Sequence, residues 1–228
     1  MSKICEGRVV IITGAGGGLG AAHARVLASE GAKVVVNDIN EAAAQAVVDD
    51  IRKAGGEAVV NTSDITHYDD SLNAVKQAIE TFGDLHAVIN NAGVNRDRMF
   101  ASMTEAEWDT IMAVHLKGHF CISSHAVHYW RGQSKAGKAV DARIINTTSG
   151  AGLQGSIGQS NYAAAKAGIA ALTLNQAAEL ARYGITANAV APAARTGMTT
   201  AVEEMAQRMA KPEDGSFALD GVDLGDDS

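Results

Sequence analysis

A chain of 228 residues, 46% of them hydrophobic, can bury one sizeable α/β core but is too short for two ordinary domains. A formal net charge of -7, with no cluster of Lys or Arg, argues against a nucleic-acid partner. No run approaches the roughly 18 apolar residues of a membrane span, and the N-terminus resembles no targeting signal. We therefore expect a cytoplasmic protein with no membrane partner. Cys5 and Cys121 fit no metal or redox spacing and indicate reduced thiols.

Short β-branched runs alternate with alanine-rich helical stretches along the chain. Strands that are apolar on both faces, separated by helices, predict a parallel sheet with helices on each side. Right-handed crossovers make this a doubly wound, Rossmann-type α/β fold that binds ligands at the carboxyl ends of its strands. Thr104 and Glu107 predict a capping box. The predicted strands are Val9–Thr13, Lys33–Asn37, Glu57–Asn61, Ala87–Asn90, Arg143–Thr147 and Thr186–Val190, and the predicted helices cover 19–29, 41–54, 68–81, 105–130 (bent) and 161–182.

The composition changes near residue 211. We expect residues 1–210 to form a single catalytic domain and residues 211–228 to form a polar, acidic tail with no further strand. The sheet edge beside the last predicted strand is therefore expected to be open or loosely covered.

A glycine-rich turn follows the first predicted strand, where residues 13–20 read TGAGGGLG and a helix begins at once. Glycine lets the backbone turn sharply and approach a pyrophosphate closely. The helix N-terminus adds free N–H groups and the positive end of its dipole. Such a turn alone can also be an ordinary loop. The residues expected to contact a dinucleotide here are Gly14, Gly18, Leu19 and Gly20.

Asp38 ends the second predicted strand, about twenty residues after the glycines, where a carboxylate can accept hydrogen bonds from both ribose hydroxyls. A 2′-phosphate at this place would be repelled. No Lys or Arg in the glycine loop or directly after Asp38 offsets the repulsion. The sequence therefore predicts NAD rather than NADP as cofactor.

Tyr162 and Lys166 are four residues apart in a predicted helix, so their side chains share a face. A free tyrosine, with a pKa of ~10, is a poor base near neutral pH. An adjacent ammonium favours the phenolate, so we expect Lys166 to lower the pKa of Tyr162 towards the working pH, where acid/base catalysis is most effective. Ser149 follows the fifth predicted strand and can hold a substrate oxygen. Alone, a Tyr/Lys pair on a helix is more often a solvated face.

Three motifs occur together: Thr13-Gly14…Gly18-Leu19-Gly20, Asn90-Asn91-Ala92-Gly93 and Ser149…Tyr162…Lys166. Jointly they resemble the short-chain dehydrogenase/reductase family over about residues 5–200. The resemblance implies an oxidoreductase that interconverts a secondary alcohol and a ketone by hydride transfer with a nicotinamide cofactor. It also implies a homo-oligomer, either a dimer or a tetramer.

The resemblance also assigns roles to individual residues. It implies that Asp64 and Ile65 flank the adenine and that Asn91 lies along the cofactor. It implies that Tyr162 transfers the proton, and that Lys166 binds the nicotinamide ribose hydroxyls while tuning Tyr162.

Two departures from the family pattern narrow the reading. His115 stands where many members have a catalytic asparagine, and Ala193 replaces the usual glycine after Pro192. With residues 95–100 and 158–162, these features resemble the (3R)-hydroxyacyl-CoA dehydrogenase subgroup of multifunctional enzyme type 2 and its actinobacterial relatives. That subgroup implies an acyl-CoA substrate in fatty-acid or sterol side-chain breakdown. In a third departure, the usual later helix and seventh strand are not recognisable.

Two histidines, His115 and His119, have the helical i, i+4 spacing of a metal pair. No third ligand and no HExxH pattern accompany them, so we predict no metal. A packed or solvated ring is the better interpretation of His119. For His115, a proton relay and a packing role remain equally open.

Three functions remain. The first is an NAD-dependent 3-hydroxyacyl-CoA dehydrogenase. The second is a 17β-hydroxysteroid dehydrogenase or a 3-oxoacyl-carrier-protein reductase, although the reductases usually prefer NADP, which Asp38 disfavours. The third is a nucleotide-binding protein without turnover.

Overall fold

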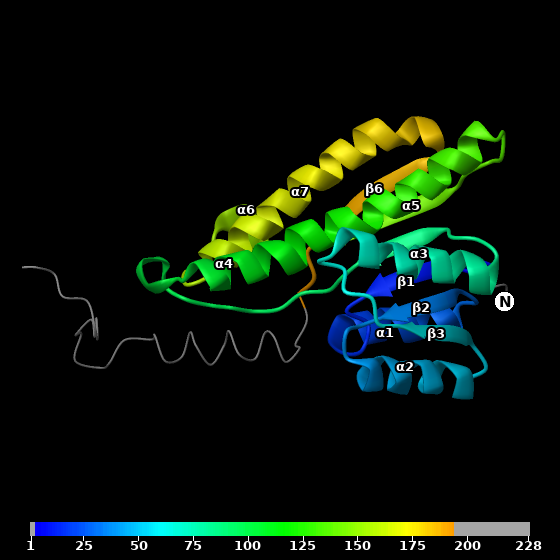
Figure 1. The fold of residues 1–228 in the computed structure, drawn as a ribbon, viewed down its shortest axis with the longest axis horizontal. Helices are drawn as coiled ribbons and strands as arrows, with labels where there is room; N and C mark the ends of the chain where they lie inside the picture. The colour runs from blue at the N-terminus through cyan, green and yellow to red at the C-terminus, as the bar shows by residue number, and fades with distance from the viewer. Residues whose placement is uncertain (1–2, 194–228) are drawn as a thin grey trace, which may run out of the picture. The chain divides into compact units, whose positions relative to one another are not determined.

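The computed structural model describes residues 3–193. Six parallel strands form one sheet in the order β3-β2-β1-β4-β5-β6 (Figure 1). The chain moves outward from β1 to β3, returns to β4 beside β1, and then moves outward the other way. This is the predicted doubly wound arrangement. The strands are β1 (Val9–Thr13), β2 (Lys33–Asn37), β3 (Glu57–Asn61), β4 (Ala87–Asn90), β5 (Ala142–Thr147) and β6 (Ile185–Val190).

The helices agree with the predicted ones except at their ends. One predicted helix is interrupted, and one short helix, α6, had not been predicted. Its five residues carry too little periodicity to reveal a helix. The α-helices are α1 (Gly18–Ser29), α2 (Glu41–Lys53), α3 (Tyr68–Phe82), α4 (Glu105–Ile111), α5 (Gly118–Lys135), α6 (Gly150–Gln154) and α7 (Ser160–Leu180), and 3-10 turns cover Phe100–Ser102 and Ala181–Tyr183.

The helix predicted over 105–130 is interrupted by a π-helical turn, Met112–Lys117, between α4 and α5. The predicted capping box opens α4: Glu107 N–H donates to the Thr104 hydroxyl, and the Glu107 carboxylate accepts from the Thr104 N–H. Met112–Lys117 contains neither Pro nor Gly, and Gly118, which follows it, does not by itself distinguish a π-turn from a continuous helix. Such turns are rare and occur frequently at functional sites.

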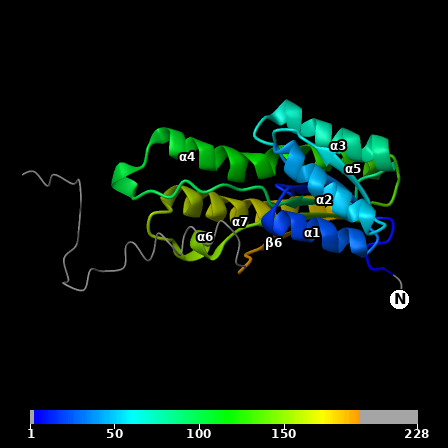
Figure 2. The same cartoon turned by 90° about the horizontal axis from the view of Figure 1, so that it is seen from below.

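Helices cover both faces of the sheet. Apolar residues of α1 and α2 pack on one face, and those of α3, α5 and α7 pack on the other. The spacing in α2 shows why: Ala44, Val47, Val48 and Ile51 recur at helical intervals and are all buried. Helix α7 lies alongside the long helical segment that contains α4 and α5 (Figures 1 and 2).

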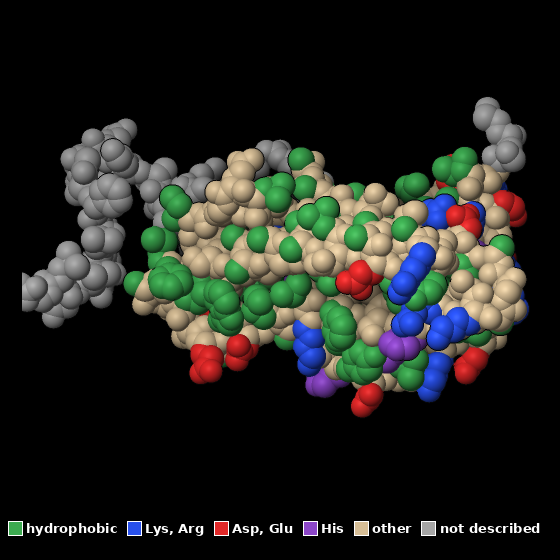
Figure 3. Space-filling view, turned by 90° about the horizontal axis from the view of Figure 1, so that it is seen from above, with side chains coloured by type: hydrophobic (Ala, Val, Ile, Leu, Met, Phe, Trp, Pro, Cys, Tyr) green, Lys and Arg blue, Asp and Glu red, His purple; other side chains and the backbone are tan. Residues whose placement is uncertain are grey.

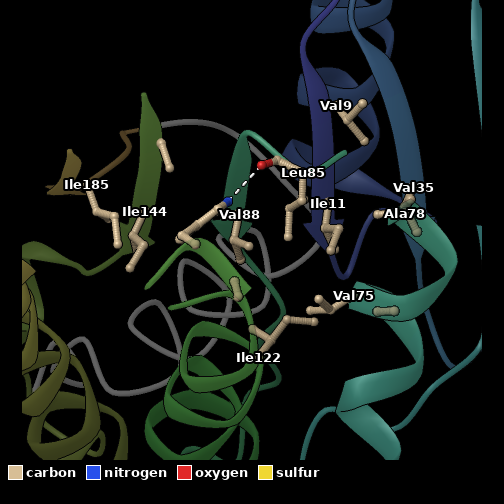
Figure 4. Packing of buried hydrophobic residues seen from close by; sticks show 14 of the residues in the cluster. Val9, Ile11, Val35, Val75, Ala78, Leu85, Val88, Ile122, Ile144 and Ile185 are labelled. Atoms are coloured by element: carbon tan, nitrogen blue, oxygen red, sulfur yellow. Dashed lines mark hydrogen bonds between the residues drawn. The ribbon is translucent and has the colours of Figure 1, made fainter. Parts of the chain in front are cut away.

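Interlocking aliphatic side chains from the strands and helices form the core on the α3/α5 side (Figure 4). Val88, Ile122 and Val75, from β4, α5 and α3, lie together there. Trp130 is 2% exposed, and its indole N–H donates to the carbonyl of Leu85 at 2.7 Å, which satisfies the one polar atom of this large side chain.

The expectations about the C-terminal segment concern residues that the structure does not describe. The absent seventh strand, the open edge and the acidic tail 211–228 therefore stay predictions. Among residues 3–193, β6 is the outermost strand on its side of the sheet. No helix in that part of the chain is long and apolar enough to span a membrane.

Candidate active site

The glycine loop between β1 and α1 is packed tightly on one side and open on the other. Gly14 has a φ of 62°, and a Cβ there would lie 2.6 Å from the Cα of Ala92. A Cβ on Gly20 would lie 2.3 Å from the Gly14 carbonyl oxygen. By contrast, a Cβ on Gly17 or Gly18 would meet nothing within 4 Å. No side chain caps the N-terminus of α1, so its first N–H groups suit an anion that approaches from the open side.

Thr13 and Asn91 fasten this loop to the end of β4. The Thr13 hydroxyl accepts hydrogen bonds from the N–H groups of Asn91 and Ala92, at 3.0 and 3.1 Å. The Asn91 side-chain amide donates to the carbonyls of Thr13 and Gly14, at 3.1 and 3.2 Å. Asn91 thus lies beneath the loop and shapes it. Thr13 belongs to the glycine motif of the sequence, but no role was expected of its side chain, although a polar residue that ends an apolar strand is a signal.

Asp38 lies at the end of β2 and faces the glycine loop. Its Oδ2 accepts the Gly16 N–H at 2.9 Å, and its Oδ1 accepts the Asn40 N–H at 2.9 Å. These bonds fix the carboxylate, whose oxygens can accept further hydrogen bonds. None of the ion pairs within residues 3–193 involves Asp38. The site therefore fits a ribose diol.

Asp64 and Ile65 follow β3. Asp64 Oδ1 accepts hydrogen bonds from the N–H and the hydroxyl of Thr66, both at 2.8 Å, and Oδ2 lies 3.0 Å from His67 Nδ1. Burial opposes ionisation of Asp64, but these hydrogen bonds together outweigh it and lower the pKa. The Asp64 side chain is thus occupied locally. Ile65 is buried, and a Cβ on Gly118 would lie 2.8 Å from its Cδ1.

Ser149, Tyr162 and Lys166 converge beside the carboxyl end of β5. Ser149 caps α6, and its Oγ accepts the Ala151 N–H at 3.2 Å. Lys166 is 2% exposed; its Nζ donates to the carbonyl of Thr147 at 2.6 Å and lies 5.4 Å from the centre of the Tyr162 ring. The structure thus brings together the three residues that the sequence singled out.

The pKa of Tyr162 differs from our expectation. Burial raises it, a hydrogen bond with Ser149 lowers it, and the charge of Asp97 raises it, with a net rise. The expectation failed because it considered the ammonium and neglected the loss of water around the phenol. Burial also lowers the pKa of Lys166, to about 8. In the protein alone, Tyr162 is therefore a protonated phenol at neutral pH and can donate a proton.

His115 projects from the π-helical turn to the edge of the Tyr162 ring, with ring centres 5.2 Å apart. It is 1% exposed, and its Nε2 lies 2.8 Å from the Val94 carbonyl oxygen. Burial, and then the charge of Lys166, lower the pKa of His115 to about 3. His119 is fully buried, and burial holds its pKa well below the ordinary value. Both rings are neutral at pH 7, and residues 3–193 contain no group of three metal ligands.

Buried amides line the carboxyl end of the sheet. Asn37 donates to Asn61 Oδ1 at 2.7 Å across β2 and β3, and Asn90 donates to Asn146 Oδ1 at 2.8 Å across β4 and β5. Asn146 donates in turn to Thr173 and to Gln176 Oε1, both at 2.8 Å and both on α7. These buried amides, the amide row, join β2 to β3, β4 to β5, and β5 to α7 at the edge of the sheet where the site lies. Asparagines that end β2, β3 and β4, and one that stands a residue before the end of β5, were its signal in the sequence.

A family model described as short chain dehydrogenase matches residues 8–207. The chain belongs to the short-chain dehydrogenase family. Members of this family are oxidoreductases, which agrees with the fold and with the residues at the carboxyl edge of the sheet.

Several members of the short-chain dehydrogenase family are similar to this chain. A hydroxyacyl-CoA dehydrogenase of Mycobacterium tuberculosis is 48% identical over 187 residues, which are 79% of this chain and 59% of that protein. The peroxisomal multifunctional enzyme type 2 of Mus musculus is 40% identical over 217 residues, 91% of this chain and 28% of that protein. The crystal structure of a short chain dehydrogenase from Mycobacterium avium has a TM-score of 0.83 at 60% identity, covering 86% of this chain and 70% of that chain. This chain thus spans less than two thirds of both curated relatives.

Proposed function

We propose that this short-chain dehydrogenase is an NAD-dependent enzyme that oxidises 3-hydroxyacyl-CoA to 3-oxoacyl-CoA, in fatty-acid or sterol side-chain breakdown, and catalyses the reverse reaction. The observation that carries the proposal is the convergence of Ser149, Tyr162 and Lys166 beside a glycine loop whose far side is open. The hydroxyacyl-CoA dehydrogenase name of a relative at 48% identity supports the substrate class.

The cofactor would be held by the groups that face the open side of the glycine loop. Asp38 would accept hydrogen bonds from the adenosine ribose, and the backbone around Asp64 and Ile65 would border the adenine. Asn91 would contribute to cofactor binding indirectly, because its side-chain amide holds the glycine loop in place. Lys166 would bind the second ribose with the donors that Thr147 leaves free. When bound, the nicotinamide supplies or accepts the hydride.

The chain's own residues handle the substrate oxygen and its proton. In ketone reduction, the Tyr162 phenol donates its proton to the substrate oxygen while Ser149 holds that oxygen. In alcohol oxidation, Tyr162 takes the proton back, and the nearby ammonium of Lys166 stabilises the phenolate. The charge of Lys166 is largely present at neutral pH, because its pKa is about 8.

Steady-state assays with NAD test the proposed function. We expect turnover of a 3-hydroxyacyl-CoA at a higher kcat/KM than of a 17β-hydroxysteroid. Preferential turnover of the steroid would establish a hydroxysteroid dehydrogenase instead. A 3-oxoacyl-carrier-protein substrate with NADPH tests the reductase alternative, which Asp38 disfavours. NADH binding without turnover of any of these substrates would support a nucleotide-binding protein.

The fixed carboxylate of Asp38 leads to a prediction about cofactor choice. NADH should bind more tightly than NADPH, because a 2′-phosphate would meet this negative charge. Asp38→Ala should reduce the difference between the two affinities, because NADH loses its hydrogen bonds to the carboxylate and the 2′-phosphate of NADPH is no longer repelled. Fluorescence titration of both cofactors measures the effect, with Asp49→Ala on the exposed side of α2 as control. Equal affinities for NADH and NADPH in the unmutated protein would exclude NAD specificity.

His115 is proposed to relay a proton between Lys166 and solvent, in place of the family's asparagine. The neutral ring of His115 has one donor and one acceptor nitrogen. It can therefore hold, by a hydrogen bond, a water molecule that carries the proton, while the ring itself stays uncharged. His115→Ala should therefore reduce kcat and alter its pH profile, whereas His115→Asn should retain more activity. If all three proteins give the same kcat at every pH, His115 serves packing alone.

A homo-oligomer is also proposed, with a second copy against α5 and α7. Hydrophobic side chains form a band along this side of the molecule (Figure 3). Phe120 is 50% and Leu174 73% exposed among the described residues. Phe120 borders a groove of about 550 Å³ with Met112, Leu116 and Leu172, a concentration of apolar surface typical of interfaces.

Sedimentation tests this surface directly. Phe120→Lys should dissociate the oligomer, whereas Val26→Lys, at a position on α1 that is 61% exposed, should leave it intact. A monomer in the unmutated protein, or an unchanged assembly in Phe120→Lys, would refute the interface.

A further inference from the structure

The loop 94–98 is attached to the segment that begins the helix of Tyr162. Arg98 N–H donates to the Gly158 carbonyl at 2.7 Å, and Arg98 forms a parallel bridge with Gln159. The side-chain amide of Gln159, which is 6% exposed, donates to Asp97 Oδ1 at 3.2 Å. The loop thus follows the N-terminal end of α7 for several residues, and it brings the charge of Asp97 near Tyr162.

Asn161 joins three parts of the site through one side chain. It has no exposed surface. Its Oδ1 accepts the backbone N–H of Tyr162 at 2.7 Å, and its Nδ2 donates to the carbonyls of Arg96, at 3.1 Å, and Glu107, at 3.3 Å. Both amide hydrogens and the oxygen therefore have partners, on the loop, on α4 and on α7.

The part of α4 that Asn161 contacts is itself held firmly. Glu107 pairs with Arg98 at 2.8 Å and accepts hydrogen bonds from the backbone and hydroxyl of Thr104. These bonds, the one with Arg98 first, lower the pKa of Glu107 to about 2. Glu107 thus stays ionised at any pH used for assays. The Glu107 carbonyl is a fixed point from which Asn161 can hold both the loop and the helix.

We propose that Asn161 is a positioning residue that places the loop 94–98 and the acid/base Tyr162 in a fixed mutual relation. The proposal rests on the proposed role of Tyr162. Asn161 touches no reacting atom. Without its side chain, the partly buried carbonyls of Arg96 and Glu107 lose a donor and the Tyr162 N–H loses its acceptor, which costs free energy. We expect the loop then to be held at the start of α7 only by the bonds of Asp97 and Arg98, and the phenol to shift relative to a substrate bound between the loop and Tyr162.

Asn161→Ala tests the proposal. We expect kcat to fall by about 10²-fold, the loss that a misplacement of about 1 Å can cause. KM for a 3-hydroxyacyl-CoA should rise, while the Kd for NADH stays unchanged, because the glycine loop and Asp38 lie elsewhere. Asn175→Ala is the matched control: Asn175 lies on the same helix, is exposed, and within residues 3–193 donates only to the carbonyl of Ala171. It should behave as the unmutated protein does.

Asn161→Asp distinguishes the hydrogen bond to the Tyr162 N–H from the hydrogen bonds to the carbonyls of Arg96 and Glu107. It retains an oxygen for the Tyr162 N–H but replaces the amide group that binds the loop and α4 with an oxygen that the carbonyls of Arg96 and Glu107 repel. KM should rise in this variant, with a smaller loss of kcat than in Asn161→Ala. Hydrogen exchange of residues 94–103 should accelerate in both variants and not in Asn175→Ala.

The outcomes distinguish this inference from the proposed function. If Tyr162→Phe stays active, the proposed role of Tyr162 fails, whatever Asn161 does. If Tyr162→Phe is inactive while either Asn161 variant keeps the kcat, KM and loop exchange of the control, the positioning role is overturned. It is also overturned if the Asn161 variants lose NADH binding in proportion to activity, since that marks general unfolding.

Discussion

Replacing Tyr162 with Phe should lower kcat by about 10²–10⁴-fold, the usual contribution of general acid–base catalysis. The substitution removes one hydroxyl and keeps the ring that packs against His115. NADH affinity should remain close to that of the unmutated protein. Single-turnover kinetics and fluorescence titration measure the two effects. Tyr183→Phe, in the turn after α7, is the control and should be fully active.

The pH dependence of the reaction should disappear in the same variant. Burial raises the pKa of Tyr162, so the phenol is protonated at neutral pH in the protein alone. Ketone reduction needs this proton, and because the phenol already carries it at neutral pH, the rate of reduction should change little there. Alcohol oxidation needs the phenolate and should accelerate towards higher pH. A Tyr162→Phe variant that kept most of its rate and this pH trend would show that another group is the acid/base.

Gly20→Ala should disrupt the nucleotide end of the site although it adds only one methyl group. The new Cβ would lie 2.3 Å from the Gly14 carbonyl oxygen and 2.6 Å from Asn91 Nδ2. These neighbours hold the loop to β4 and cannot move independently. We expect a loss of about 1–3 kcal/mol in the free energy of unfolding, as for other overpacked sites. NADH affinity should fall at least tenfold, about 1.4 kcal/mol.

Gly132→Ala provides the control for Gly20→Ala. Gly132 lies on the exposed side of α5, and a Cβ there would meet nothing within 4 Å. Alanine at this position should stabilise the protein by up to about 1 kcal/mol, because glycine is a poor helix former. Denaturant unfolding and NADH titration of both variants provide the comparison. Normal stability and NADH binding in Gly20→Ala would mean that the loop is not held as the structure shows.

The sequence predicted the strands well because most of them are short apolar runs bounded by polar residues or glycine. Strands β1 to β4 begin and end at the predicted residues, and β5 and β6 begin one residue earlier. The proximity of Tyr162 and Lys166 also followed from the chain, since it depends only on the helical repeat. The convergence with Ser149 followed from the rule that carboxyl ends of parallel strands meet at one edge of the sheet.

Features that depend on contacts between distant segments could not be predicted. The π-helical turn coincides with the place where His115 packs against Gly93 and Val94, residues that follow β4. The raised pKa of Tyr162 depends on how much water the assembled site excludes. Asn161 shows no pattern in the sequence, because its partners at Arg96 and Glu107 are backbone carbonyls and carry no residue signature.

The amide row at the carboxyl end of the sheet has a consequence for how the strands find their correct alignment during folding. Strands β2 and β3, and β4 and β5, present mostly aliphatic side chains, so a pairing shifted by two residues would still place apolar groups on the same faces. In the native pairing Asn37 lies opposite Asn61, and Asn90 lies opposite Asn146. A shifted pairing would separate these partners and leave polar groups buried without hydrogen bonds, at a cost of about 1–3 kcal/mol each. The asparagines therefore make misaligned sheets unstable where the aliphatic residues alone would tolerate them.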